Sequence, residues 1–235
     1  MKGLQQEIKD KYDELGYSQG WRFLNCPEKN LVSNNGIIII TLNPGVGNGI
    51  DYKMHSEFSS EAGCSFYYED WQSPVQDQFK KFLKLLFLEI QPNICYRSFI
   101  NSVLIGYFIP FRSRKFKDLS PNKKKSIDFG IKIWRKIIEA NKDSVRLVVC
   151  IDNTTLRALK EIFSELNIKE EKEIDPLSTG WGKYQANIFH YSYGNKNITL
   201  LKLPHLSRFR IFGREIAKNK IDTIMKAATH DMKDQ

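Results

Sequence analysis

Three polar side chains in this chain of 235 residues stand at or near the ends of short apolar runs: Asn43, Asn101 and His205. The amide of Asn offers both a hydrogen-bond donor and an acceptor, and the imidazole of His donates or exchanges a proton near neutral pH. Taken singly, an Asn in a loop is usually a turn former and a lone His is usually a structural hydrogen-bonding residue. Their coincidence at three predicted strand ends is therefore the informative observation.

Asn43 follows four consecutive isoleucines at positions 37–40. This run is β-branched and apolar on both faces, which predicts a central strand buried between helical layers. Pro44 ends the strand, and the glycine-rich segment 45–49 permits turns and close approach of a ligand. Ligands bind at the carboxyl ends of strands in open α/β sheets, so we expect Asn43 at the rim of a site. A buried strand followed by an ordinary loop explains these residues equally well.

The elements that must position these side chains alternate between strand and helix. The expected helices cover residues 2–15, 74 to about 91, 121–138, 153–166 and 211–228, and the expected strands cover 37–41, 97–104, 145–151, 186–193 and 198–203. Residues 167–185 are expected to form an acidic connector. No linker or repeat divides the chain. The pattern predicts an α/β fold, a single domain over residues 1–235 built as a three-layer αβα sandwich around a mainly parallel sheet.

Charge and cysteine content narrow the class of protein. Lys and Arg total 36 against 27 Asp and Glu, and the net charge of +9 favours a polyanionic partner such as nucleic acid or an anionic membrane surface. No apolar run reaches the roughly 18 residues that span a membrane, and no signal peptide is evident, so we expect a cytoplasmic protein. The four cysteines form no C-x-x-C pair, so we expect reduced thiols and no metal site.

Three short motifs carry a resemblance to a known family. Thr41-Leu42-Asn43-Pro44-Gly45 resembles the first motif of the uracil-DNA glycosylase superfamily in its mismatch-specific and single-strand-selective branches. Phe99-Ile100-Asn101-Ser102-Val103 resembles the base-recognition strand of that superfamily, and Pro204-His205-Leu206-Ser207 resembles its closing motif. The resemblance spans about residues 36–228. Asn43 replaces the acidic residue that activates water in the uracil-specific enzymes.

The resemblance implies a DNA glycosylase that flips a modified or damaged pyrimidine out of DNA and hydrolyses its N-glycosidic bond without a cofactor, leaving an abasic site. Catalysis would fall to Asn43, which would orient water, and to His205, which would stabilise negative charge on the departing base. The base would be bound by Asn101, Gly45 and an aromatic of the long loop, Phe66 or Tyr67. Those two aromatics would otherwise simply pack the loop.

DNA contacts would come from the closing motif and the residues after it. Leu206 would enter the base stack, while Ser207, Arg208 and Arg210 would hold phosphates. An ordinary basic surface at a helix start explains the same residues. We expect a monomer whose partner is DNA.

The segment 46–71 is long for a strand-to-helix connection, and it combines aromatics with polar groups such as Asp51, His55 and Glu57. Glycosylases resembling this superfamily include antiviral enzymes that remove sugar-modified cytosines from phage DNA. We therefore hypothesise a pocket for a 5-substituted cytosine, with glucosylated hydroxymethylcytosine as the sharpest case. A surface insertion or a partner-binding element is the alternative for this segment.

Three other functions stay open at the level of sequence. The first is ordinary uracil or mismatch repair, and the second is a nucleic-acid-binding module that has lost catalysis, as Asn43 in place of an acid allows. The third is a nucleotide-binding protein that cradles phosphate with residues 45–49. That segment lacks the P-loop lysine and the full G-x-G-x-x-G spacing.

Overall fold

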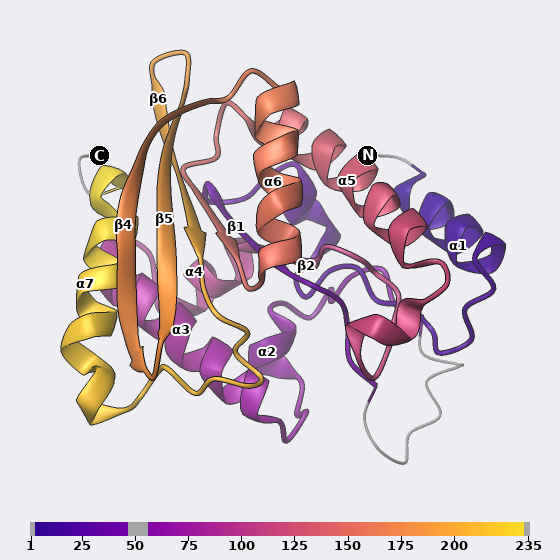
Figure 1. Ribbon diagram of the computed structural model, residues 1–235, viewed down its shortest axis with the longest axis horizontal. Helices are drawn as coiled ribbons and strands as arrows, with labels where there is room; N and C mark the ends of the chain where they lie inside the picture. Colours follow the sequence, from indigo (N-terminus) through magenta and orange to yellow (C-terminus); the bar gives the residue numbers. More distant parts are fainter. Residues whose placement is uncertain (1–2, 47–55, 233–235) are drawn as a thin grey trace.

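The computed structural model of this chain describes residues 3–46 and 56–232, and it contains a mixed sheet with helices on both faces (Figure 1). The strands are β1 (Ile37–Thr41), β2 (Leu104–Tyr107), β3 (Leu147–Cys150), β4 (Lys169–Trp181), β5 (Tyr184–Tyr193) and β6 (Lys196–Lys202). The helices are α1 (Leu4–Glu14), α2 (Ser65–Tyr68), α3 (Pro74–Ile90), α4 (Tyr96–Ser102), α5 (Lys123–Asn141), α6 (Asn153–Glu165) and α7 (Lys218–Ala228). Turns of 3-10 helix cover Glu28–Leu31, Phe116–Leu119, Glu215–Ala217 and His230–Met232.

The strands form one sheet in the order β2-β1-β3-β6-β5-β4. β1 runs parallel to β2 and β3, and β3 runs parallel to β6. β5 is antiparallel to both of its neighbours, β6 and β4. The predicted fold class is confirmed: the chain is an α/β protein with a mainly parallel central sheet between two helical layers.

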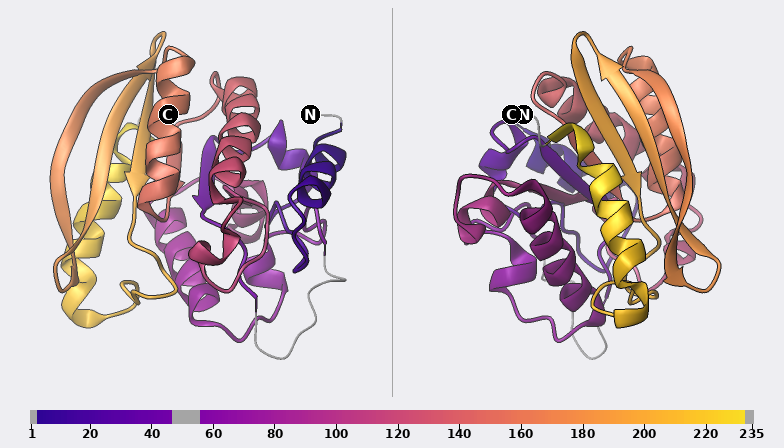
Figure 2. Two further views of the ribbon diagram at one scale, coloured as in Figure 1. Left: turned by 45° about the vertical axis from the view of Figure 1, so that its right-hand side comes forward. Right: turned by 90° about the vertical axis from the view of Figure 1, so that its left-hand side faces the viewer.

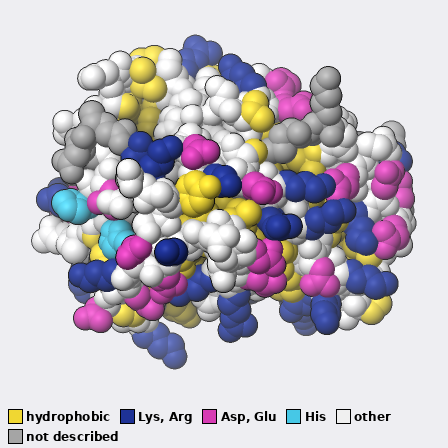
Figure 3. Space-filling model, turned by 90° about the horizontal axis from the view of Figure 1, so that it is seen from above, with side chains coloured by type: hydrophobic (Ala, Val, Ile, Leu, Met, Phe, Trp, Pro, Cys, Tyr) yellow, Lys and Arg dark blue, Asp and Glu magenta, His cyan; other side chains and the backbone are white. Residues whose placement is uncertain are grey.

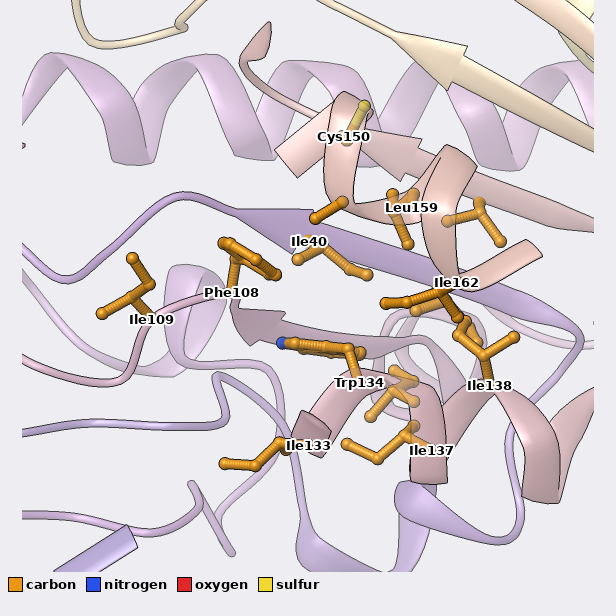
Figure 4. Packing of buried hydrophobic residues seen from close by; sticks show 14 of the residues in the cluster. Ile40, Phe108, Ile109, Ile133, Trp134, Ile137, Ile138, Cys150, Leu159 and Ile162 are labelled. Carbon is orange, nitrogen blue, oxygen red and sulfur yellow. The ribbon is translucent and has the colours of Figure 1, made fainter. Parts of the chain in front are cut away.

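Helices cover both faces of the sheet (Figure 2), and alternate residues of the central strand β1 belong to the apolar clusters on opposite faces. Ile38 and Ile40 belong to the apolar cluster that contains side chains of α1, α5 and α6, and Figure 4 shows Ile40 in that cluster together with Trp134 of α5. Ile37 and Ile39 belong to the cluster that contains side chains of α3, α4 and α7. Because successive side chains of a strand point to opposite faces, a strand covered on both sides must be apolar at every position. The predicted central strand is confirmed.

The predicted helix starts at Ser73 and Asp152 are confirmed by side-chain caps. Ser73 Oγ accepts a hydrogen bond from Gln76 N at 3.4 Å at the start of α3. Asp152 Oδ1 accepts from the backbone N–H groups of Thr154 and Thr155 at 2.7 and 2.9 Å at the start of α6. These caps satisfy N–H groups that have no partner within the helix.

The predicted strand 97–104 is wrong over most of its length. Residues Tyr96–Ser102 form helix α4, and strand β2 begins only at Leu104. Phe99 is buried and packs on Phe87 of α3, with ring centroids 5.4 Å apart. A short apolar run fits a strand or a helix equally well, and here packing against α3 decides the outcome.

The C-terminal third also departs from expectation in two places. Residues 167–185 are not a connector, because Lys169–Trp181 form the edge strand β4, whose charged side chains are mostly exposed. Such charges are typical of an edge strand that must not pair with other chains. The last helix begins at Lys218 rather than at 211, since Ile211 and Phe212 are buried in an irregular segment.

Charges of both signs are interspersed on the end of the molecule shown in Figure 3, which lies opposite the carboxyl ends of the parallel strands.

In the part of the chain that the structure describes, no helix is both long enough and apolar enough to cross a bilayer.

Candidate functional site

A cleft of about 440 Å³ opens where the parallel strands end. It lies at the lower end of the sheet in Figure 1, between the sheet, α2 and α3 and the loops after β2 and β6. Its lining combines aromatic, polar and basic side chains: Thr41, Leu42, Asn43, Gly45, Phe66, Trp71, Val75, Phe79, Tyr107, Ser113, Arg114, Lys115, Phe116, Ile151, His205, Leu206, Ser207, Arg208 and Phe209. The prediction that the site lies at the carboxyl ends of the strands agrees with the position of this cleft.

Strand periodicity explains why these side chains meet. Ile39 packs in the cluster of α3, so Thr41, two residues later in β1, faces the same side of the sheet. Tyr107 is the register partner of Thr41 on β2. Ile151 and His205 follow β3 and β6 with the same alternation as Val149 and Leu203 in that cluster. Four strand ends therefore supply side chains to one cavity.

His205 is held in a tight turn directly after β6. Its carbonyl oxygen accepts hydrogen bonds from the N–H groups of Arg208 and Phe209 at 3.0 and 3.1 Å. Its Nδ1 lies 2.7 Å from Ser207 Oγ. When the Ser207 hydroxyl donates to Nδ1, the neutral ring carries its proton on Nε2, and this N–H is the group that can donate to a ligand.

Burial lowers the pKa of His205, and the nearby positive charge of Arg208 lowers it further, while the carboxylate of Asp152 acts in the opposite direction. The imidazole is therefore neutral at pH 7. A neutral imidazole can stabilise a developing anion by donating a hydrogen bond without transferring its proton.

The side-chain amide of Asn43 is oriented by the hydrogen bonds that its nitrogen, Nδ2, donates. Nδ2 donates to Ser113 Oγ at 2.9 Å and to the carbonyl oxygen of Pro44 at 3.1 Å. Among the described residues no donor reaches its Oδ1. The amide oxygen is thus the end that can accept a hydrogen bond from a water molecule or ligand in the cleft.

One wall of the cleft is a rigid aromatic stack. The rings of Phe66 and Phe79 lie parallel with centroids 4.0 Å apart, and Trp71 contacts Phe66 edge-on at 4.9 Å. Trp71 Nε1 donates to Glu69 Oε2 at 2.7 Å, and Glu69 pairs with both terminal nitrogens of Arg22. Arg22 is 5% exposed, so the guanidinium of this bidentate ion pair is shielded from solvent, and the carboxylate of Glu69 orients Trp71.

The rim of the cleft is basic. Arg114 and Lys115 line it on one side, and Arg208 lines it on the other. No carboxylate occurs among the described residues of the lining. Ser207 also lines the cleft, whereas Arg210 is exposed but does not line it. An anionic ligand such as a phosphate is favoured at this rim.

Asn101 does not belong to the site, so its expected contact with a base is corrected. It lies in α4, before β2, and therefore at the amino end of the sheet. Its Oδ1 accepts from Cys64 N at 3.1 Å, and its Nδ2 donates to the Tyr68 hydroxyl at 3.2 Å. These hydrogen bonds use both ends of the amide to hold α2 against α4.

Tyr67 does not line the cleft, and Leu206 lines it only as a buried side chain, which does not fit its expected role. Tyr67 lies on α2 but is 47% exposed, contacts Tyr68 and Tyr96, and does not line the cleft. Leu206 is fully buried in the apolar cluster of α3 and α7. A side chain that enters a base stack must be accessible, and Leu206 would have to leave the core to do so.

Much of the polar loop expected to hold a bulky substituent lies outside the described residues, including Asp51 and His55 and the glycine-rich residues 47–49. In the described part, Glu57 pairs with Arg22 at 3.2 Å, and Ser59 donates to Glu61 at 2.7 Å. None of the three side chains of this loop, those of Glu57, Ser59 and Glu61, lines the cleft. From this loop the lining instead receives Phe66 and Trp71.

Sequence reasoning missed Thr41 and Tyr107 and the segment Ser113–Phe116. Strand alternation beyond the isoleucine run would have placed Thr41 on the face of Ile37 and Ile39. Tyr107 and the segment after it could not be placed in this way, because the expected strand 97–104 ends before Tyr107, the last residue of β2.

Within residues 3–46 and 56–232 no group of three or more His, Cys, Asp or Glu side chains could hold a metal ion. Cys26, Cys64 and Cys150 are buried free thiols, and burial raises the pKa of Cys26 and Cys64 to about 12. The side chains that line the cleft provide hydrogen-bonding, aromatic and cationic groups.

Comparison with known proteins gives no assignment: no protein-family model, no curated protein and no solved structure matches this chain. The class that the fold defines is an α/β three-layer protein with a cleft at the carboxyl ends of its parallel strands.

Proposed function

We propose that this protein is a DNA glycosylase that flips a modified or damaged pyrimidine out of DNA and hydrolyses its N-glycosidic bond. The observation that carries the proposal is the convergence of Asn43 and a neutral His205 in one cleft with an aromatic wall and a basic rim. The volume of about 440 Å³ is within the range of sites for small organic ligands.

The reaction needs two groups of opposite function. The bond between sugar and base breaks with its electron pair going to the base, while a water oxygen bonds to the sugar carbon and the water loses a proton to solvent. His205 donates a hydrogen bond to the base as negative charge develops. Asn43 accepts a hydrogen bond from the attacking water through Oδ1 and orients it, since a carboxamide is too weak a base to remove the proton.

The other groups of the cleft suit an extruded nucleotide. Trp71, which is partly exposed and packs edge-on against the buried parallel rings of Phe66 and Phe79, provides an apolar surface for a flat base. Ser207, Arg208 and Arg210 follow His205 and are exposed, where they can contact phosphates on either side of the flipped nucleotide. The net charge of +9 favours DNA as the partner.

For the substrate, we propose a 5-substituted cytosine, with glucosylated hydroxymethylcytosine in phage DNA as the leading case and antiviral defence as the role. Uracil or mismatch repair is the alternative within the same chemistry. A module that binds nucleic acid without cleaving it is the alternative outside it. We further propose that the protein acts as a monomer in the cytoplasm.

The test is abasic-site formation on oligonucleotides that contain uracil, cytosine, hydroxymethylcytosine or glucosylated hydroxymethylcytosine, each single-stranded and in a duplex. Wild type should produce abasic sites on at least one modified cytosine. His205→Ala should lower that rate about 10²- to 10³-fold, the loss typical of one transition-state donor, with DNA affinity unchanged. Excision of uracil alone would replace the proposed substrate with uracil, and DNA binding without any abasic product would leave the inactive binding module.

A further inference from the structure

We propose that Thr41 is a specificity-determining residue of the cleft, whose hydroxyl pairs with the polar edge of the bound pyrimidine. The identity of the ligand in this inference rests on the proposed function. The assignment of Thr41 to ligand binding rests on its own geometry.

The hydroxyl of Thr41 is buried and has no hydrogen-bond partner among the described residues, and the residue as a whole is 8% exposed. Its backbone is fully engaged, since its carbonyl oxygen accepts from Phe108 N at 2.6 Å and β1 pairs with β2 at this position. Burial of an unpaired hydroxyl destabilises a folded protein. A group of this kind requires an explanation.

The location of Thr41 supplies that explanation. Four of the described residues carry a buried side-chain nitrogen or oxygen with neither a hydrogen-bond nor an ion-pair partner, and only Thr41 among them lines the cleft; the others are Asn25, Asn30 and Asn35. The neighbours of Thr41 on the same face of β1 are Ile37 and Ile39, so an apolar side chain would continue the pattern of this strand. The strand instead places a hydroxyl where it ends at the cleft.

Depth separates the role of Thr41 from that of Asn43. Asn43 follows two residues later, beyond the end of β1, and it is partly exposed, whereas Thr41 is 8% exposed. A flipped nucleotide enters with the base first and leaves its sugar near the mouth. Asn43 is thus placed near the sugar, where water attacks, and Thr41 near the base. A hydroxyl donates and accepts, so it can pair with a carbonyl oxygen or an exocyclic amino group.

Two variants at this position separate ligand binding from a structural role. Thr41→Val keeps the shape and removes the hydroxyl, and Thr41→Ser keeps the hydroxyl and removes the methyl group. The matched control is Thr179→Val, because the Thr179 hydroxyl is also buried but donates to the Tyr184 carbonyl at 2.7 Å in the β4–β5 hairpin, and Thr179 does not line the cleft. The control should lower the melting temperature by a few degrees, and Thr41→Val should leave it unchanged or raise it.

Binding is measured by titration with free uracil, cytosine and 5-hydroxymethylcytosine, and with an oligonucleotide that carries a tetrahydrofuran abasic analogue. Thr41→Val should bind the preferred free base about tenfold more weakly, Thr41→Ser should bind it within about twofold of wild type, and both should bind the abasic oligonucleotide normally. Unchanged base affinity in Thr41→Val would overturn the inference. So would a loss of melting temperature equal to that of the control, or no base binding by wild type.

The same variants distinguish this inference from the proposed function. If wild type releases no base from any DNA but Thr41→Val still weakens base binding, the proposed glycosylase activity fails and the role of Thr41 stands. If wild type releases a base and Thr41→Val releases it with the same preference among bases, the role of Thr41 fails and the proposed function stands.

Discussion

At the scale of single residues, His205 links the chemistry of the cleft to pH. Its pKa is lowered chiefly by burial, so the unfolded chain binds a proton more readily than the folded one as the pH falls through the ordinary range of His. The contribution of this residue to stability is therefore complete above about pH 6.5 and is lost as the pH falls through the lower pKa of the folded state.

We expect the melting temperature of wild type to fall more steeply between pH 7 and pH 5 than that of His205→Gln. His230→Gln is the matched control, because His230 is exposed in a terminal 3-10 turn, and it should follow the wild-type curve. Scanning calorimetry at several pH values measures the difference. Parallel curves for wild type and His205→Gln would show that the imidazole is not held neutral by the fold.

Gly45 tests whether a ligand approaches the backbone of the cleft. A Cβ atom at this position would have no heavy atom within 4 Å, and the residue has no left-handed conformation that demands glycine. Gly45→Ala should therefore leave the melting temperature within about 2 °C of wild type, while affinity for the oligonucleotide substrate should fall if the ligand contacts this stretch. Gly106→Ala is the contrasting variant, since its Cβ would meet Trp134 at 3.0 Å, and it should lose stability.

At the scale of elements, the wall of the cleft depends on the ion pair between Glu69 and Arg22. Removing the carboxylate leaves the buried guanidinium of Arg22 with only its ion pair to Glu57, at 3.2 Å. Glu69→Ala should lower the free energy of unfolding by about 2 kcal/mol, less than for a fully buried pair because the Glu69 side chain is 35% exposed. Asp77→Ala, which breaks the exposed pair with Lys81, should cost at most about 0.5 kcal/mol.

Glu69→Ala should also release Trp71, whose indole N–H would lose its acceptor. Urea titration followed by tryptophan fluorescence measures both effects. Equal loss of stability in Glu69→Ala and Asp77→Ala would mean that Arg22 finds another partner and that the wall does not depend on this network.

Helices and strands were predictable where local chemistry and periodicity agreed. Ser73 and Asp152 are capping residues in sequence and in structure, and the isoleucines of β1 have no competing interpretation. The apolar run around Phe99 fits either a helix or a strand, and only its packing on Phe87 decides for the helix. Because of that local error, Asn101 was expected at the carboxyl end of a strand, whereas it lies before the amino end of β2. The spacing of residues within the motif gives no sign of this difference.

The residues of the candidate site also fall into those that local sequence predicts and those that it does not. The positions of Asn43 and His205 at the cleft were predictable, because each residue follows a strand whose end is marked by proline. The burial of Leu206 and the engagement of both ends of the Asn101 amide were not, because they depend on contacts with elements far away in the chain. Thr41 was not predictable as a site residue, because a threonine at a strand end is common. It becomes informative only once the structure shows that its buried hydroxyl has no hydrogen-bond partner among the described residues.

At the scale of the whole molecule, the net charge of +9 and the basic rim predict salt-dependent DNA binding. Affinity for a single-stranded oligonucleotide should fall linearly on a logarithmic plot against salt. Arg208→Ala should weaken binding to all sequences alike and reduce the magnitude of the slope by about one. Lys124→Ala, on the exposed face of α5, is the control and should leave the slope unchanged. A slope near zero in wild type would favour a small nucleotide as ligand.

The most direct test of the central claim is to identify the product that wild type releases from DNA containing modified cytosine, in water enriched in ¹⁸O. Hydrolysis of the N-glycosidic bond predicts a free base without ¹⁸O, and an equal amount of abasic sugar that carries it. His205→Ala should slow the appearance of both products together. Release of a nucleoside or nucleotide, or recovery of intact DNA after complete binding from modified-cytosine and uracil substrates alike, would contradict the assignment of this cleft to glycosidic hydrolysis.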